Sequence, residues 1–320
     1  MKENIIKKIN LEKLKSIFRE RRTATKSELA SISGLSVVTV NSLVKTLLAD
    51  NEILEDKTIH PDLGRPATSY RFNETVRLAL IIYMYEEKKQ DIVCYSVCNL
   101  YGETIKAVKE INKISAACFE KNIQKLLTQY PNIKVIIFSI PGEEYNGKFL
   151  ICDYSGLDTN FPAALRKKFG LDIYFENDIN SALYGYCSRL SISNCVGIYM
   201  PSKYPPGSAI FFKGEIIKGK NNLAGEIKYL PYGINWEEFS YSKEEMEKFL
   251  LNTIKIYMCV YNPEQIVIYA NINNTELQNK LNKLLKSNNE KLMLPEIIIK
   301  NNLKDDVSSG LIINALKKII

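Results

Sequence analysis

The chain reads KSELASISGLSVVTVNSLVKTLL from Lys26 to Leu48, and this stretch has the pattern of two short helices joined by a tight turn. Gly34 supplies the backbone freedom that a sharp turn between helices needs, and Ser36 is a residue type that caps helix N-termini. Such a pattern is typical of a helix-turn-helix, whose second helix enters a DNA major groove. The apolar stripe of the second helix consists of Val40, Leu43, Val44, Leu47 and Leu48.

The outward side of this second helix carries the candidate DNA-reading residues. Asn41 can pair bidentately with adenine, and Val38 can touch a thymine methyl group. Phosphate contacts would fix the position of the helix on the duplex without reading sequence. The predicted base-contacting residues are Val38, Thr39, Asn41 and Ser42, and the predicted phosphate-contacting residues are Ser36 and Lys45.

A hairpin is predicted directly after the second helix. Glu52–Glu55 and Thr68–Phe72 alternate as short strands do, and Gly64-Arg65-Pro66 forms a stiff turn between them. A hairpin in this place is a wing, and Arg65 could enter an A·T-rich minor groove. The alternative is a small packing module of helices and hairpin that binds no ligand.

Composition excludes several classes of protein. The 320 residues suggest two or three domains, and 46% hydrophobic with 25% charged residues is ordinary for a soluble chain. The net charge of +7 is too mild to prove nucleic-acid binding. The seven cysteines form no CxxC or CxC pair, which favours reduced thiols in a cytoplasmic protein without a signal peptide. We expect no membrane span, because no apolar run is long enough.

An amphipathic helix is predicted over residues 4–22. It ends in Arg19-Glu20-Arg21-Arg22, and these arginines would either meet phosphates or form a solvated helix end. The predicted buried side consists of Ile5, Ile6, Ile9, Leu14, Ile17 and Phe18.

After Asn73 the chain alternates between strand and helix patterns, in two rounds that each open with a hairpin. This repetition predicts a duplicated two-lobed α/β fold with a cleft between the lobes. We expect domains over 1–75, 76–185 and 186–320. In the second round, helices are predicted over Lys243–Tyr261, Leu277–Leu285 and Ser309–Lys318.

Several ordered motifs resemble the ROK family of repressors, open reading frames and sugar kinases. The first unit resembles the winged helix-turn-helix of the family's repressor branch, and the likeness extends over nearly the whole chain. The matching segments are Gly34-Leu35-Ser36, Gly64-Arg65-Pro66, Ile140-Pro141-Gly142, Glu176-Asn177-Asp178 through Ala182, Lys213-Gly214-Glu215, Ala224-Gly225-Glu226 and Asn262-Pro263-Glu264.

The resemblance implies an N-terminal α+β winged helix-turn-helix followed by an actin-like (ribonuclease H-like) duplicated ATPase-type domain. Family members bind a sugar in the cleft, which would place Asn177, Asp178 and Glu226 against sugar hydroxyls. The alternative is that Asn177 and Asp178 only cap the helix that follows them.

Both phosphate loops of the family's kinases are altered here. The Asp-x-Gly-Gly-Thr turn is replaced by residues 86–90, which read EEKKQ without a glycine, and two carboxylates there would repel a phosphate. The second, glycine-rich loop is replaced by residues 200–207, whose adjacent Pro205 and Pro206 remove amide donors. A base at Asp178 would have no phosphoryl donor to act with, so we expect no catalytic residues and no nucleotide cofactor.

The family's structural zinc is also expected to be absent. Its histidine position is occupied by Tyr229, and the segment from Pro231 to Trp236 lacks the family's cysteines. The chain holds only one histidine, His60, in the predicted wing loop.

The sequence therefore predicts a DNA-binding transcriptional regulator, a repressor by resemblance, that recognises a double-stranded operator as a homodimer or higher homo-oligomer. A sugar or sugar phosphate would be its effector. The alternatives are a sugar kinase with an atypical nucleotide site, and a purely structural second domain whose cleft has closed.

Overall fold

The chain forms two compact units in a computed structural model that describes residues 2–59, 66–87, 90–111, 114–152, 154, 156–201, 204–240, 242–270, 279, 283 and 294–320. The first unit comprises Met1–Leu78 together with Asn99–Glu103, and the second comprises Ala79–Cys98 and Thr104–Ile320. The turn from Asn99 to Glu103 belongs to the first unit because Arg22 binds it: Nη2 of Arg22 lies 2.7 Å from Oε1 of Glu103, and the guanidinium covers the ring of Tyr101.

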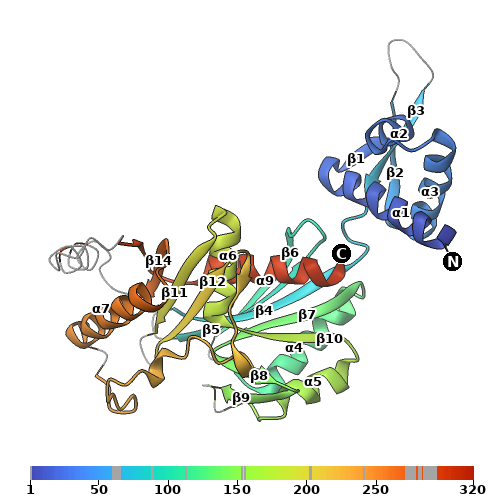
Figure 1. Ribbon diagram of the computed structural model, residues 1–320. Helices are drawn as coiled ribbons and strands as arrows, with labels where there is room; N and C mark the ends of the chain where they lie inside the picture. Colours follow the sequence, from blue (N-terminus) through green and yellow to red (C-terminus); the bar gives the residue numbers. More distant parts are fainter. Residues whose placement is uncertain are drawn as a thin grey trace. The chain divides into compact units, whose positions relative to one another are not determined.

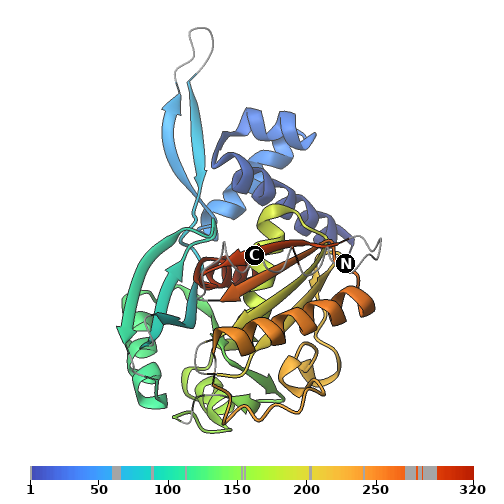
Figure 2. The same ribbon diagram turned by 90° about the vertical axis from the view of Figure 1, so that its left-hand side faces the viewer.

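The first unit packs helices against a three-stranded antiparallel sheet of order β1-β3-β2. Figure 2 shows the β2–β3 pair extending beyond the helices of this unit. Both strands of the predicted hairpin are present, and β2 continues four residues past the predicted end at Glu55. The elements are α1 (Lys2–Arg21), β1 (Thr23–Thr25), α2 (Lys26–Ser33), α3 (Val37–Ala49), β2 (Ile53–Ile59) and β3 (Ala67–Phe72).

The predicted helix-turn-helix is formed by α2 and α3, whose directions differ by 116° across the short turn. Gly34 ends α2 in the left-handed region at a φ of 67°, where a side chain would be strained. Ser36 caps α3, because its Oγ accepts a hydrogen bond from the amide of Thr39 at 3.1 Å. The capping residues therefore fix both the turn and the start of the second helix.

A buried carboxylate ties α1 to the turn between α3 and β2. Glu52 accepts two hydrogen bonds from Arg77, at 2.6 and 3.1 Å, and one from Lys15 at 3.1 Å. Burial opposes the charge of Glu52, but these hydrogen bonds outweigh it and lower the pKa of the carboxyl group. Through Lys15, these hydrogen bonds attach α1 to Glu52 and Arg77.

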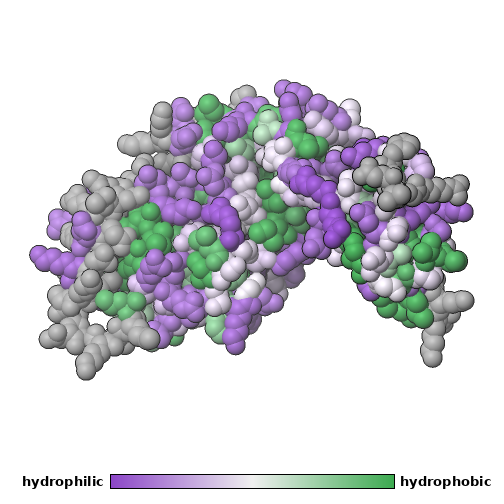
Figure 3. Space-filling model, turned by 90° about the horizontal axis from the view of Figure 1, so that it is seen from above, coloured by the Kyte–Doolittle hydropathy of each residue, from purple (hydrophilic) through white to green (hydrophobic). Residues whose placement is uncertain are grey.

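The predicted buried side of α1 is wrong for its first half. Leu14, Ile17 and Phe18 are buried, whereas Ile5, Ile6 and Ile9 are 57%, 59% and 61% exposed. The core of the first unit covers only the second half of α1. The apolar residues of the first half keep the helical spacing but have no surface of this unit to pack against. Apolar side chains accordingly lie on the surface of this unit, at the right-hand end of Figure 3.

The second unit contains two five-stranded sheets built on one plan, visible in Figure 1. Their strand orders are β10-β7-β4-β5-β6 and β13-β12-β11-β14-β15. Each sheet joins an antiparallel three-stranded part to parallel strands. This repetition confirms the predicted duplicated α/β fold.

The elements of the second unit agree with the predicted patterns at most positions. Of the predicted helix Leu277–Leu285, residues 277, 278, 280–282, 284 and 285 lie outside the described residues. The first half contains β4 (Leu78–Glu87), β5 (Gln90–Cys98), β6 (Thr104–Ile111), α4 (Ala116–Gln129), β7 (Ile133–Ile140), β8 (Gly142–Tyr145), β9 (Lys148–Cys152), α5 (Phe161–Phe169), β10 (Asp172–Asn177) and α6 (Asp178–Leu190). The second half contains β11 (Asn194–Met200), β12 (Gly207–Phe212), β13 (Glu215–Ile216), two 3-10 turns (Lys220–Asn222 and Ile227–Tyr229), α7 (Lys243–Val260), β14 (Gln265–Ala270), β15 (Glu296–Lys300) and α9 (Lys304–Ile319).

Helix α9 begins five residues before its predicted start at Ser309. Asp305 and Asp306 lie in its first turn, where carboxylates favour the positive end of the helix dipole. Asp306 is fully buried and accepts hydrogen bonds from Nη2 of Arg189 at 2.6 Å and Oη of Tyr269 at 2.9 Å. The start of α9 is therefore set by polar contacts with other elements, which periodicity does not report.

No single helix among the described residues is long and apolar enough to cross a membrane. Helices α2 and α3 reach that length and apolar character only when they are counted together, and they are bent by 116° at the turn between them.

Helices α6 and α9 cross at two glycines with almost no space between their backbones. A Cβ at Gly310 would lie 2.0 Å from the carbonyl oxygen of Ser181, and one at Gly185 would lie 2.1 Å from that of Asp306. Because a backbone atom cannot move aside as a side-chain tip can, only glycine fits at either position.

We expect Gly310→Ala to destabilise the second unit. Alanine is favoured over glycine in a helix by about 1 kcal/mol, but overpacking costs about 1–3 kcal/mol and more where backbone is met. The melting temperature should therefore fall. The matched control is Ser309→Ala on the same helix, which should change stability by no more than about 0.5 kcal/mol. A Gly310→Ala protein as stable as the control would contradict the close crossing.

Candidate functional site

The outward face of α3 presents the predicted DNA-reading side chains. Val38 is 79% exposed, Ser42 and Lys45 are exposed, and Thr39 and Asn41 are half-buried. Among the described residues, no hydrogen bond or ion pair engages the side chains of Asn41 or Lys45. Both are therefore available to a partner, although their roles toward DNA stay predictions.

Ser36 has a structural task that limits its predicted contact with a phosphate. Its Oγ accepts from the Thr39 amide and lies 2.8 Å from Oγ1 of Thr39. The two hydroxyl groups therefore satisfy each other at the start of α3. Arg65, the predicted minor-groove residue, lies outside the described residues, while Pro66 and the strands on either side of the loop are described.

A pocket in the second unit brings together the three predicted ligand-binding residues. Asn177 and Asp178 come from the junction of β10 and α6, and Glu226 comes from the segment after Gly225. The position of this segment depends on Gly225, at a φ of 94°, since a Cβ there would lie 2.1 Å from the carbonyl oxygen of Ser208. The pocket is lined by Met84, Tyr85, Asp91, Pro141, Gly142, Glu143, Ile151, Tyr154, Asn177–Asn180, Tyr199, Pro201, Tyr204–Ser208, Ala224, Glu226 and Lys228.

The capping role of Asn177 is confirmed. Its Oδ1 accepts from the amides of Ile179 and Asn180 at 3.1 and 3.2 Å, which makes it the N-cap of α6. Oδ1 of Asp178 accepts from the Ile179 amide at 2.7 Å, and Asp178 is buried in the first turn. Capping does not exclude ligand contact, since both residues also line the pocket.

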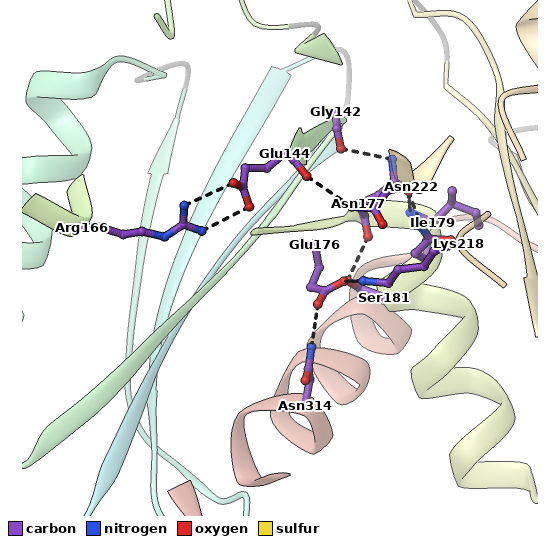
Figure 4. A network of polar contacts seen from close by, with 11 residues as sticks. Gly142, Glu144, Arg166, Glu176, Asn177, Ile179, Ser181, Lys218, Asn222 and Asn314 are labelled. Atoms are coloured by element: carbon purple, nitrogen blue, oxygen red, sulfur yellow. Dashed lines mark hydrogen bonds and ion pairs between the residues drawn. The ribbon is translucent and has the colours of Figure 1, made fainter. Parts of the chain in front are cut away.

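The lysines near the pocket are paired with carboxylates. Nζ of Lys228 lies 3.2 Å from Oε2 of Glu226, and Nζ of Lys218 lies 2.6 Å from Oε2 of Glu176. Figure 4 shows Glu176 held between Lys218 and Asn314, whose Nδ2 donates to Oε1 at 3.0 Å. The positive charge of these lysines is therefore largely neutralised within the protein.

Glu143 is a pocket residue that the sequence analysis missed, although it directly follows the Pro141-Gly142 motif. Gly142 lets β8 approach β9 closely, since a Cβ there would lie 2.4 Å from the carbonyl oxygen of Ile151. The next residue, Glu143, is thereby held in the pocket wall with only 5% exposure. Among the described residues its carboxyl group has no hydrogen bond or ion pair.

Burial raises the pKa of the Glu143 carboxyl group to about 8. The positive charge of Lys218 lowers this pKa, and the negative charges of Glu226, Glu176 and Asp178 raise it further. At neutral pH Glu143 is therefore mostly protonated, in a pocket that other carboxyl groups also line.

Aromatic rings and prolines line the pocket near the two altered phosphate loops. Strands β4 and β5 pair as far as Glu87 and Gln90, so only two residues connect them. Tyr154 and Tyr204 form an edge-to-face pair with ring centroids 6.1 Å apart. Pro205 and Pro206 follow and carry no amide donors.

Aromatic packing holds the segment from Pro231 to Trp236, where the resemblance would place the family's zinc loop. Trp236 packs edge to face on Phe249 at 5.2 Å and donates a hydrogen bond from Nε1 to the carbonyl oxygen of Lys228 at 2.9 Å. Tyr232 packs on the same ring at 5.5 Å. Tyr229, at the position of the family's histidine, is 72% exposed. Within the described part of the chain, no three His, Cys, Asp or Glu side chains are grouped to hold a metal.

Comparison with solved structures identifies the fold. A ROK family transcriptional regulator, described as a homologue of the Escherichia coli Mlc protein, superposes with a TM-score of 0.62 at 15% identity, over 98% of this chain and 99% of that one. The chain has the fold of ROK proteins. No family model matches the sequence, and no curated protein matches it either.

Other ROK structures cover only the larger part of the chain. The Lmo2764 protein of Listeria monocytogenes, a putative N-acetylmannosamine kinase, has a TM-score of 0.59 at 16% identity and covers 75% of this chain and 99% of its own. A ROK protein from Streptococcus pneumoniae, solved with sucrose, has a TM-score of 0.58 at 13% identity over 75% of this chain and 98% of its own. The regulator thus shares an additional quarter of the chain that these proteins lack.

We expect Glu143→Gln to stabilise the protein increasingly as the pH rises. Between pH 4.5, the ordinary pKa, and about 8, the folded protein keeps a proton that the unfolded chain releases. The free energy of unfolding of the wild type should therefore fall by about 1.4 kcal/mol per pH unit between these two values. The contribution of Glu143 to stability is complete below pH 4.5 and is lost as the pH approaches 8. Glutamine has no proton to lose. Urea unfolding of both proteins at pH 5, 6.5 and 8 measures the gap, and a constant gap would contradict the burial of Glu143.

Proposed function

We propose that the protein is a cytoplasmic transcriptional regulator, a repressor, that reads DNA with a winged helix-turn-helix and carries a catalytically inactive ROK-type unit. The proposal is carried by the outer face of α3, the helix that follows the capped turn. On this face Asn41 and Lys45 have no partner among the described residues. Beside them Val38, an apolar residue, is 79% exposed, where a partner's surface would cover it.

The proposed contacts follow from the positions on α3. Asn41 reads adenine, Val38 meets a thymine methyl group, and Thr39 and Ser42 face neighbouring base edges. Lys45 and Ser36 contact phosphates on either side. Arg65 enters the adjacent minor groove from the loop between β2 and β3.

The ROK-type unit is proposed to dimerise the protein and to bind a sugar effector. One recognition helix reads too few base pairs to select a site in a genome, so two copies are needed. Asn177, Asp178 and Glu226 supply the amide and carboxylate groups that would bind sugar hydroxyls, and they meet in one pocket.

Catalytic inactivity is proposed from the pocket wall. Phosphate groups bind to backbone amides, glycine-rich turns and unpaired cations. The pocket instead offers prolines, tyrosines and carboxylates, and its Lys228 is paired with Glu226. A sugar kinase remains the second candidate because Asp178 lies in the first turn of α6 inside the pocket, where a general base for a sugar hydroxyl would be needed.

We expect substitutions on α3 to separate two kinds of DNA contact. Asn41→Ala should cost about 1–3 kcal/mol on a selected site and relax preference at one position per half-site. Lys45→Ala should weaken all sequences alike and reduce the salt dependence by about one charge per subunit. Fluorescence anisotropy on a selected palindrome and a scrambled duplex, at two salt concentrations, measures both effects.

The control for the charge change is Lys248→Ala, which removes an exposed lysine from α7 in the second unit. It should leave both the affinity and the salt dependence as in the wild type. If the wild type binds the palindrome and the scrambled duplex equally, specific regulation is refuted whatever the variants do.

We expect neither ATP–Mg²⁺ binding nor phosphorylation of common hexoses by the purified protein, because the described pocket wall offers prolines, tyrosines and carboxyl groups in place of glycine-rich turns and unpaired cations. Coupled-enzyme assays with glucose, mannose and N-acetylmannosamine test this. Turnover above background that Asp178→Asn removes would establish the kinase function instead.

A further inference from the structure

Three side chains that line the pocket of the second unit have no hydrogen bond to another described residue. The first is Glu143, which is 5% exposed. The others are Oδ1 of Asn180, whose residue is also 5% exposed, and Oη of Tyr85. Because leaving a buried polar group unpaired costs free energy, such groups are retained where a ligand satisfies them. The oxygen of Asn180 is an acceptor, and both oxygens of Glu143 become acceptors when its carboxyl group releases its proton.

The charged residues of the pocket determine which charge on a ligand is favoured. Of the described residues that line it, Lys228 is the one cation, and Glu226 already pairs with it at 3.2 Å. Asp91, Glu143 and Asp178 add further carboxyl groups. A phosphate or carboxylate on the ligand would bring more acceptors and negative charge to groups that already repel each other. The wall therefore disfavours an anionic effector, including a sugar phosphate.

We propose that this pocket binds a compact polyhydroxyl molecule that carries a protonated amine, with the ammonium group between Glu143 and Asp178. The inference rests on the proposed sugar-binding role of the unit and specifies the chemical class of its ligand. An ammonium group supplies three donors and a positive charge, which are what Glu143 and Asn180 lack. Neutral hydroxyl groups supply the donors alone.

Two further features fit an amine. The edge-to-face pair of Tyr154 and Tyr204 lies in the pocket wall, and aromatic faces attract cations as well as sugar C–H groups. The raised pKa of Glu143, about 8, reflects burial and the neighbouring charges of Glu226, Glu176 and Asp178, which Lys218 only partly offsets. An ammonium ligand would add the missing positive charge, so Glu143 would release its proton to the buffer on binding.

Isothermal titration calorimetry on the full chain at pH 6.5 tests the proposal. The probes are glucosamine, galactosamine and mannosamine, each with its parent hexose and its N-acetyl derivative, and glucose 6-phosphate. At least one amino sugar should bind tenfold or more tightly than its hexose and N-acetyl forms, which corresponds to about 1.4 kcal/mol. Measurements in two buffers of different ionisation enthalpy should show the release of about one proton.

Glu143→Gln keeps the shape of the side chain and should abolish both the amine preference and the proton release. Binding of the neutral hexose, where it is measurable, should persist and shows that the variant is folded, as does its melting temperature. The matched control is Glu237→Gln, an exposed carboxylate outside the pocket, which should behave as the wild type.

The proposal is overturned if no amino sugar binds, if a neutral hexose or glucose 6-phosphate binds as tightly, or if Glu143→Gln keeps the amine preference. These outcomes are separate from a failure of the proposed function, which is measured by DNA anisotropy without any sugar. Specific DNA binding without an amine preference would reject this inference alone.

Discussion

The crossing of α6 and α9 at Gly185 and Gly310 is the contact on which the second unit depends. Helix α6 touches β7 and β10 of one sheet and β11, β12 and β13 of the other, so it joins the two halves of the duplicated fold. Helix α9 lies against it and also contacts β7. Backbone-to-backbone packing at this distance leaves no room for adjustment, because any side chain would meet a carbonyl group. The two helices therefore behave as one rigid element.

Polar contacts at both ends of α6 fix the position of this helix. At its start, Asn177 caps the helix and Asp178 enters the pocket. Near its end, Arg189 reaches the buried carboxylate of Asp306, which also binds Tyr269 on β14 and Lys300 on β15. A buried charge with several partners fixes geometry more than it adds stability. The position of Asp178 in the pocket is thus tied to the second sheet through α6.

The two units differ in where they carry polar side chains without a protein partner. In the first unit, the buried carboxylate of Glu52 is matched by Arg77 and Lys15, whereas Asn41 and Lys45 on the outer face of α3 have no partner among the described residues. In the second unit, Glu143 and Asn180 are buried in the pocket wall beside aromatic rings and have no hydrogen bond from their side-chain oxygens to another described residue. Unpaired polar groups on a convex helix suit a large, charged surface such as DNA, whereas buried ones suit a small molecule that can be enclosed. A fold shared with kinases does not decide between these uses, since function resides in the site.

The sequence by itself determined the helix-turn-helix, its turn at Gly34, its cap at Ser36 and the duplicated strand–helix order, because local capping, backbone freedom and apolar periodicity act over a few residues. Resemblance to a family motif also led to the prediction of Asn177, Asp178 and Glu226 as ligand-binding residues, and the three line one pocket. Tertiary structure alone decided that Ile5, Ile6 and Ile9 are exposed, because the core ends before that half of α1. It also decided that Glu143 lines the same pocket as Asp178 and Glu226, since residues tens of positions apart come together only when β8, α6 and the segment after Gly225 surround one pocket. Whether a carboxyl group is solvated or buried, and hence its pKa, depends on those distant neighbours and leaves no local signal in the chain.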